Sequence, residues 1–273
     1  MSPKTYKPAP LPVKLAALAR SPQFFWFLGH ATSVVLFLTL QIVLFFTRPL
    51  STILYRLILV SELVSYGIVA KLLGLLKKSV FKMQSIHDEN VQYVGFAVVL
   101  FLTSFKLGPW SKALYSYVIF SFFHAIVYFQ ANLLEVMPMS LAAQAAWSDR
   151  ITFMSSNYNQ QALYFASMNE VFLVMDFLWA VPAILFRIFR DPVYILYQAV
   201  LMFAVAVFLK LRYAHSAYTR NILMQLDAKV TGLLSHPVVP SALLQFYAVN
   251  FKGMVLWITE MIPTPTQVSK KTQ

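Results

Sequence analysis

Six long apolar stretches lie between Phe24 and Leu211, and short basic or polar joints separate them. Hydrophobic residues make up 59% of the chain and charged residues only 12%, whereas about 25% of the residues of a typical soluble domain are charged. Apolar stretches of this length are typical of helices that cross a bilayer. The sequence therefore predicts an all-α, polytopic integral membrane protein.

The number of crossings depends on the length of each stretch. A helix needs roughly 20 apolar residues to cross a hydrocarbon core of about 30 Å. Four stretches meet this length: residues 24–46, 50–76, 113–134 and 163–186. Residues 92–105 and 193–209 form shorter stretches, and a helix over residues 92–105 would reach only about 21 Å. The sequence thus predicts four to six spans, some of them of unequal depth.

Proline-containing joints connect neighbouring stretches at residues 47–49, 106–109 and 187–192. Such short links force the flanking helices to run antiparallel, so we expect three helical hairpins. Longer polar segments around residues 77–90 and 135–161 are expected to be loops between them. The predicted organisation is a basic cytosolic arm (1–23), a membrane domain (24–211), interfacial amphipathic helices (212–263) and a disordered tail (264–273).

Basic residues give the expected orientation. The net charge is +12, and the 22 Lys and Arg residues are scattered at the ends of the apolar stretches. This distribution is typical of topology signals and of contacts with anionic lipid, and it argues against nucleic-acid binding. The arm, the joint after the first hairpin and the tail all carry basic residues and fall on one side of the membrane, which we expect to be cytosolic.

Two amphipathic helices are predicted after the last apolar stretch. Over residues 216–235, and again from residue 241, apolar side chains recur at steps of three or four. A basic, moderately hydrophobic pair of this kind suits the membrane interface. The residues expected there are Ile222, Leu223, Leu226, Val230, Leu233, Phe251, Met254, Trp257 and Ile258. The same stripes would equally suit packing on the cytosolic ends of the spans, and the sequence leaves both alternatives open.

Several ionisable or polar side chains fall inside the apolar stretches, where the cost of insertion makes each a candidate for function. They are His30, Glu62, His124, Asn169, Glu170 and Asp176. One hypothesis is an embedded enzyme or transporter that uses His124 with Glu170 or Asp176. The alternative, which we favour, is that these groups bond to one another or to backbone within the bundle. Arg56 and Glu62 are likewise expected to meet neighbours on other helices.

No motif in the sequence supports the hypothesis of an embedded enzyme or transporter. There is no Cys, and no HxxxH, DxxD, HExxH, GxSxG or Gly-rich phosphate loop is present. We therefore expect no catalytic residues, no bound metal and no cofactor.

Three segments carry a resemblance to a known family. They are SFFHAIVYFQANLL at residues 121–134, YNQQALYFASMNEVFLVM at residues 158–175 and LKLRYAHSAYTRNILMQLDAKV at residues 209–230. In these segments the chain resembles the transmembrane protein 33 family, and specifically its yeast branch of pore-membrane proteins. His124, Asn169, Glu170 and Arg212 match family-like positions, but the match implies no role for them.

The resemblance implies a membrane protein of the endoplasmic reticulum and nuclear envelope, including the nuclear pore membrane. It further implies association with reticulon-type membrane-shaping proteins and with nuclear pore components, and it attaches no enzymatic activity to the chain. Hairpins of unequal depth and an interfacial tail would also suit a curved membrane. The expected function is therefore non-enzymatic: shaping or stabilising curved membrane and contributing to the organisation of nuclear pore complexes.

Overall fold

The structure, a computed structural model, describes residues 11–75, 88–187 and 189–260, except for the side chains of residues 178, 183 and 257–259. The first part of the basic arm, the joint at 76–87, the tail at 264–273 and the side chains of Trp257 and Ile258 lie outside the described residues.

The described part of the chain is helical and contains no strand, as the sequence predicts. The longer helices are α1 (Leu11–Leu18), α2 (Pro22–Val43), α3 (Arg48–Leu72), α4 (Glu89–Leu107), α5 (Tyr115–Asn132), α6 (Leu141–Arg187), α7 (Pro192–His215) and α8 (Ala217–Leu234). The shorter ones are η2 (Ser111–Leu114), η3 (Leu134–Val136), α9 (Ser241–Gln245), the π-helical η4 (Phe246–Phe251) and α10 (Lys252–Glu260).

The predicted joints are where helices end and begin. Thr47 accepts a hydrogen bond from the backbone N–H of Leu50, and Asp191 accepts one from that of Tyr194. These caps satisfy N–H groups that lack a partner in the first helical turn, and each is followed by a proline suited to that position. Gly108 ends α4 with a φ of 85°, a conformation that favours glycine.

Six helices are long and apolar enough to cross a membrane in the part of the chain that the structure describes. This number lies within the predicted range of four to six, and both shorter stretches are parts of longer helices because polar residues extend them. The stretch at 92–105 becomes α4, which has 19 residues and is about 28 Å long. The stretch at 193–209 becomes α7, which has 24 residues.

The expectation of a polar loop at residues 135–161 is also wrong. From Leu141 onward this segment is the first half of α6, a helix of 47 residues and about 70 Å. Its polar side chains have partners on neighbouring segments. The amide of Gln130 on α5 donates to the Ser148 backbone carbonyl at 3.0 Å and to the Thr152 hydroxyl at 2.8 Å. Polarity here marks contacts between helices rather than a break in helical structure.

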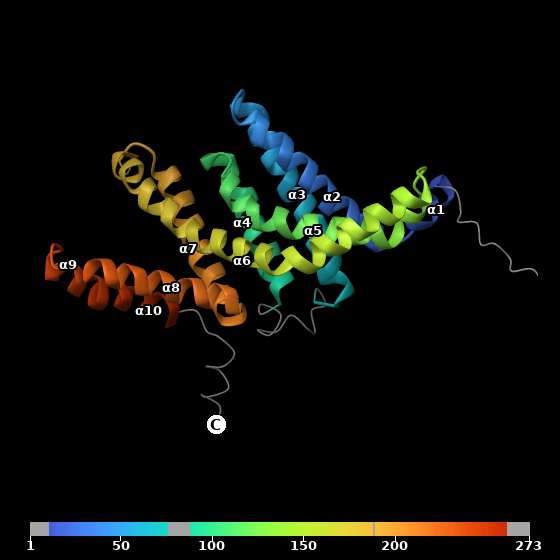
Figure 1. Cartoon of the computed structure of the whole chain (residues 1–273). Coiled ribbons are helices and arrows are strands. Elements are labelled where there is room, and N and C mark those ends of the chain that lie inside the picture. Colours follow the sequence, from blue (N-terminus) through green and yellow to red (C-terminus); the bar gives the residue numbers. More distant parts are fainter. Residues whose placement is uncertain (1–10, 76–87, 188, 261–273) are drawn as a thin grey trace, which may run out of the picture.

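The predicted hairpins differ in how closely their helices pack. The helices α2 and α3 lie side by side, and Gly29 lets them approach: a Cβ at that position would lie 2.1 Å from Ser65 Oγ. The helices α4 and α5 diverge after their joint, so that α4 packs on α3 and α7 while α5 packs on α2 and α6. In Figure 1, α6 runs across the molecule from the side of α1 to the joint with α7, and the α8–α10 segment lies below α7.

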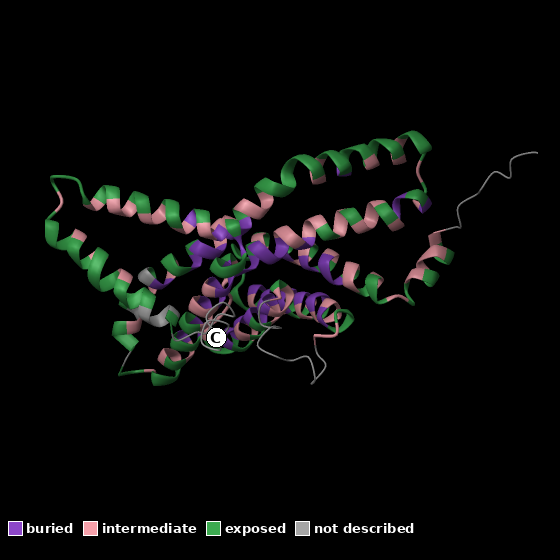
Figure 2. Ribbon diagram, turned by 90° about the horizontal axis from the view of Figure 1, so that it is seen from below, coloured by how far each residue is buried: buried purple, intermediate pink, exposed green. Residues whose placement is uncertain are grey.

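The core lies where the helices cross. Buried positions gather in the middle of the molecule, whereas the outer arms are mostly exposed or half-buried (Figure 2). Aromatic rings form much of this core: Tyr66 stacks on Tyr93 with 5.5 Å between ring centroids, and Phe96 stacks on Phe208 with 4.5 Å. The centre of the bundle is also where most of the candidate polar residues are found.

Candidate functional sites

Glu170 belongs to a buried ionic cluster that joins α4, α6 and α7. The Arg212 Nε–H donates to Glu170 Oε2 at 3.1 Å, and the Tyr93 hydroxyl donates to Glu170 Oε1. Arg212 Nη1 also lies 2.9 Å from Glu89 Oε1, although its N–H groups are not aligned for a hydrogen bond. Glu170 and Arg212 are only 1% and 4% exposed. We call Tyr93, Glu89, Glu170 and Arg212 the arginine cluster.

A second buried chain of hydrogen bonds joins α2, α3 and α5. The Ser121 hydroxyl donates to Glu62 Oε1 at 2.7 Å, and Ser121 Oγ lies 2.6 Å from His30 Nδ1. Because that hydroxyl is already donating, it accepts from the Nδ1–H tautomer of His30. All three side chains are almost completely buried. We call His30, Glu62 and Ser121 the histidine cluster.

A third set of contacts fixes α6 to the start of α5. Asp176 accepts hydrogen bonds from Trp110 Nε1 at 2.8 Å and from Lys112 Nζ at 2.7 Å. About two helical turns earlier on α6, the Asn169 amide donates to the Lys112 backbone carbonyl at 3.1 Å. These residues connect the joint after α4 with the later part of α6.

The structure does not assemble the catalytic site that pairs His124 with Glu170 or Asp176. The His124 ring packs against Trp26 and His30, with centroids 5.0 and 5.1 Å away. Within the described residues it makes no hydrogen bond or ion pair with either carboxylate, each of which has other partners. That part of the chain also contains no group of three or more His, Cys, Asp or Glu side chains placed to hold a metal ion. The arrangement favours helix packing as the role of these groups.

The C-terminal segment folds into a helical hairpin of α8 against α9, η4 and α10. Asp227 on α8 accepts hydrogen bonds from the Tyr247 hydroxyl at 2.8 Å and from Lys252 Nζ at 2.9 Å. These bonds lower the pKa of Asp227, with Lys252 the larger cause. Burial and the bond to Asp227 raise the pKa of Tyr247 to about 12. Both groups therefore keep their bonding protonation states across the neutral range.

The predicted interface residues divide into two groups. Ile222 is buried against the bundle core, and Leu223 and Leu226 are half-buried against it. Val230 is half-buried, whereas Leu233, Phe251 and Met254 are exposed. The start of the α8 stripe therefore faces protein, which is the alternative that the sequence left open. The apolar side chains at the end of α8 and in the η4–α10 segment are exposed instead.

Sequence reasoning missed three residues that the structure makes central. Arg212 belongs to α7, which continues to His215, and it was grouped with the interfacial segment. The sequence assigns no role to Ser121 or Gly29, because neither belongs to a recognised motif. The signal that could have found Gly29 is the pair of small residues Gly29 and Ser33, four apart, opposite Ser61 and Ser65 on α3.

The fold and these sites define a multi-pass, all-α membrane protein whose buried polar groups join its helices. Comparison with known proteins gives the family. Residues 12–258 match the family described as "Transmembrane protein 33/Nucleoporin POM33", and the chain belongs to this family.

Named relatives are fungal. The chain is 28% identical over 268 residues to the "Pore and endoplasmic reticulum protein of 33 kDa" of Saccharomyces cerevisiae, with 93% of this chain and 97% of the relative covered. It is 27% identical over 277 residues to "Nucleoporin POM33" of Chaetomium thermophilum, covering 88% and 91%. No solved structure shows significant similarity to the chain.

These matches confirm the predicted family and its yeast branch. With six candidate spans, they also confirm the predicted class and location: a multi-pass protein of the endoplasmic reticulum and nuclear envelope membranes. Its relatives bear the names of pore-membrane proteins and a nucleoporin rather than of enzymes.

Proposed function

We propose that this protein is a non-enzymatic scaffold that stabilises curved membrane of the endoplasmic reticulum and nuclear envelope and contributes to the organisation of nuclear pore complexes. The pore association in the names of its relatives supports the second part. One observation carries the first part: the C-terminal hairpin presents apolar side chains outward directly after the last membrane-spanning helix.

The geometry of the hairpin separates a bonded side from an apolar side. Tyr247 and Lys252 face α8, where they bond to Asp227. Phe246 and Val249 are 60% and 64% exposed. Further exposed apolar residues on the same hairpin are Leu233, Leu243, Met254 and Leu256. Exposed apolar side chains gathered on one segment in this way favour an interaction site.

The membrane is the partner that the position of the hairpin favours. Only Ser216 separates α7, a candidate span, from α8, so the hairpin begins where the chain leaves the bilayer. Arg220 and Lys229 add positive charge that would favour anionic lipid. An amphipathic helix inserted into one leaflet displaces headgroups on that side alone, which is a physical route to curvature. Reticulon-type proteins are the further partners that we propose for the same curved membrane.

The full-length protein in giant vesicles from which nanotubes are drawn tests this proposal. The protein should concentrate in the tube relative to the flat membrane, and Phe246→Asp with Val249→Asp should abolish that enrichment. Gln245→Asp with Asn250→Asp is the matched control, because it adds the same charge at exposed polar positions of the same segment. Equal enrichment of both variants would overturn a role of the apolar surface in curvature.

The same pair of variants, introduced in cells in place of the natural protein, tests the cellular part. The Phe246→Asp, Val249→Asp protein should accumulate normally but alter pore distribution and reticulum tubules, whereas the control variant should not. Normal pores and tubules with both variants would contradict the proposed contribution to pore organisation.

A further inference from the structure

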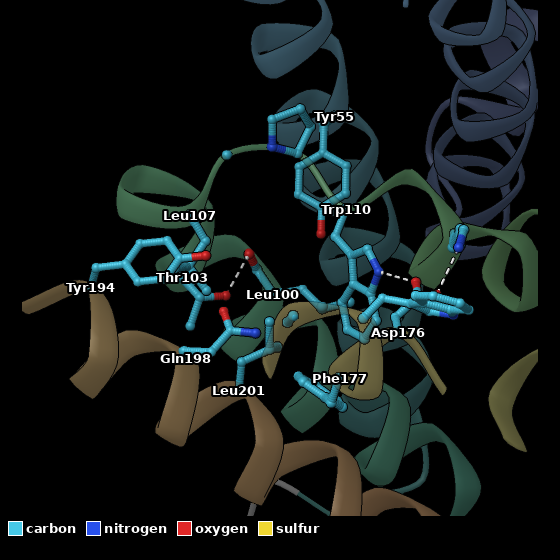
Figure 3. Close-up of a pocket in the computed structure, with 15 residues that line it drawn as sticks. Tyr55, Leu100, Thr103, Leu107, Trp110, Asp176, Phe177, Tyr194, Gln198 and Leu201 are labelled. Carbon is cyan, nitrogen blue, oxygen red and sulfur yellow. Dashed lines mark hydrogen bonds and ion pairs between the residues drawn. The ribbon is translucent and has the colours of Figure 1, made fainter. Parts of the chain in front are cut away.

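A cavity of about 420 Å³ lies between α3, α4, α6 and α7 beside the joint after α4 (Figure 3). This volume is in the range of small-molecule sites. The cavity is separate from the arginine and histidine clusters and from the C-terminal hairpin.

One wall of the cavity carries a polar side chain that makes no hydrogen bond to the described part of the chain. Gln198 on α7 is only 8% exposed, and its amide makes no hydrogen bond within the described part of the chain. Figure 3 shows this amide beside Thr103 and directed into the cavity. The Thr103 hydroxyl donates to the Val99 carbonyl at 2.8 Å and keeps lone pairs free to accept. Gln198 and Thr103 together offer a donor and acceptors to the cavity, which suits a ligand group that both donates and accepts.

The charged groups of the cavity neutralise each other. Asp176 is held by Lys112 at 2.7 Å and by Trp110 at 2.8 Å. Since this carboxylate and this ammonium are already paired, the cavity offers no uncompensated cation to a phosphate group. The polar part of the ligand is therefore neutral.

The remaining walls are apolar, and the polar pair lies at a fixed depth. Leu100, Phe177 and Leu201 are buried and line the cavity. Thr103 precedes the end of α4 by four residues and Gln198 follows the start of α7 by six, which places them about 6–9 Å inside the helix ends. In a spanning helix this depth lies just inside the headgroup region, within reach of the hydroxyl of a neutral lipid at the boundary of the hydrocarbon.

We propose that this cavity binds a neutral membrane lipid that carries a free hydroxyl group, as sterols and diacylglycerol do. The hydroxyl donates to the Gln198 carbonyl oxygen or to Thr103 and accepts from the Gln198 amide, while the apolar part packs on Leu100, Phe177 and Leu201. Trp179, which is 82% exposed, lies on the cavity wall where it can cover the ligand. This site is independent of the proposed role in curvature.

Photo-crosslinking of the full-length protein in nanodiscs tests the proposal. A photoreactive sterol and a photoreactive diacylglycerol are used in separate arms, which identifies the class of lipid, and labelled peptides are mapped by mass spectrometry. At least one probe should label α4, α6 or α7 at the cavity. An excess of the same unlabelled lipid should displace it, and phosphatidylserine should not. Labelling that phosphatidylserine displaces equally, or the absence of labelling at the cavity by both probes, would overturn the proposal.

Two variants link the label to the cavity. Ala180→Trp fills the space and should remove the label, whereas Ala199→Trp, which adds the same side chain at an exposed position of α7, should keep it. Gln198→Leu keeps the approximate size but loses the hydrogen bonds, so apparent affinity should fall about 2- to 10-fold. Elution profile and thermal unfolding verify the fold of each variant. Unchanged labelling in folded Ala180→Trp protein, or in folded Gln198→Leu protein, would contradict the site.

Discussion

Arg212 on α7 and Glu170 on α6 form an ion pair across 3.1 Å in which both side chains are almost completely buried. Such a pair holds two helices in one register, since without Arg212 the Glu170 carboxylate would be left without compensation in a medium of low dielectric constant. Arg212 stands four residues before Ser216, the N-cap of α8, so the arginine cluster also fixes the point at which the C-terminal hairpin leaves the bundle.

Removing one member of this pair should therefore destabilise the protein strongly. Arg212→Met leaves Glu170 buried beside Tyr93, and we expect a loss of about 3–5 kcal/mol in the free energy of unfolding. The double variant Arg212→Met, Glu170→Met should lose less than Arg212→Met alone, because no buried charge remains. Denaturation in detergent measures both, and Arg190→Met, at an exposed position, is the control. A double variant as unstable as the single one would show that the charges do not act as a pair.

Gly29 and Ser65 provide a second prediction, on the packing of α2 against α3. A methyl group at position 29 would meet Ser65 Oγ at 2.1 Å and the Ser61 carbonyl oxygen at 3.0 Å. Ser65 can escape only by giving up its hydrogen bond to the Trp26 carbonyl. We expect Gly29→Ala to cost about 1–3 kcal/mol, as overpacking of a close contact does.

Two further substitutions check this interpretation in the same denaturation experiment. Adding Ser65→Ala to Gly29→Ala removes the closest atom and should recover part of the loss. Gly67→Ala on α3 has nothing within 4 Å of the new methyl group and should be neutral or stabilising. If Gly29→Ala and Gly67→Ala behaved alike, close approach at Gly29 would not be a determinant of stability.

These contacts show which parts of the structure the sequence could predict. The helix starts at Thr47 and Asp191 were predictable because capping and proline act locally. Arg56 was expected to meet another helix and does: its Nε–H donates to Ser104 Oγ on α4 at 3.0 Å. The pairing of Arg212 with Glu170 was not predictable, because it depends on how far α7 continues and on its register along α6.

The first half of α6 illustrates a different limit. Residues 141–161 are polar enough to indicate a loop, yet Gln144 bonds to the Glu135 and Met137 carbonyls and Gln130 bonds to Ser148. Tertiary contacts of this kind decide whether a polar segment is helical, and composition does not contain them. The same holds for the cavity at Gln198, whose lining comes from four helices that are distant in sequence.

Asp227 gives a prediction for the pH dependence of the C-terminal hairpin. Its pKa is lowered from the ordinary value of 3.8 by Lys252 and Tyr247. A lowered carboxylate pKa stabilises the folded form above the unfolded pKa, and that contribution is lost as pH falls through the lower folded value. The hairpin should therefore stay closed at neutral pH and loosen below about pH 4.

Distance measurements between two spin labels follow this opening. Because the chain has no Cys, labels can be placed at Ala228 and Asn250, both exposed, without background. The distance distribution should be narrow near pH 7 and broaden on acidification, whereas Asp227→Asn should be broad at both values. Tyr247→Phe keeps the Lys252 contact and should remain narrow at pH 7. If the distance distribution changed neither with pH nor with Asp227→Asn, the contact between Asp227 and Lys252 would not be what holds the hairpin closed.

The last prediction concerns the membrane topology, which follows from the number of spans. An even number of crossings returns the chain to its starting side, so the basic arm, the joint at 76–87 and the segment after α7 share one face. Since basic residues favour the cytosolic face, we expect both termini there. In sealed microsomes, single cysteines at Ser2, Ser85 and Ser269 should react with an impermeant reagent from outside. Cysteines at Phe45 and Arg190, which are exposed in the joints after α2 and α6, should react only after permeabilisation. Protection of Ser2 together with labelling of Ser269 would mean an odd number of crossings, and α6, whose first half is the most polar part of the six, would then be the first helix to reconsider.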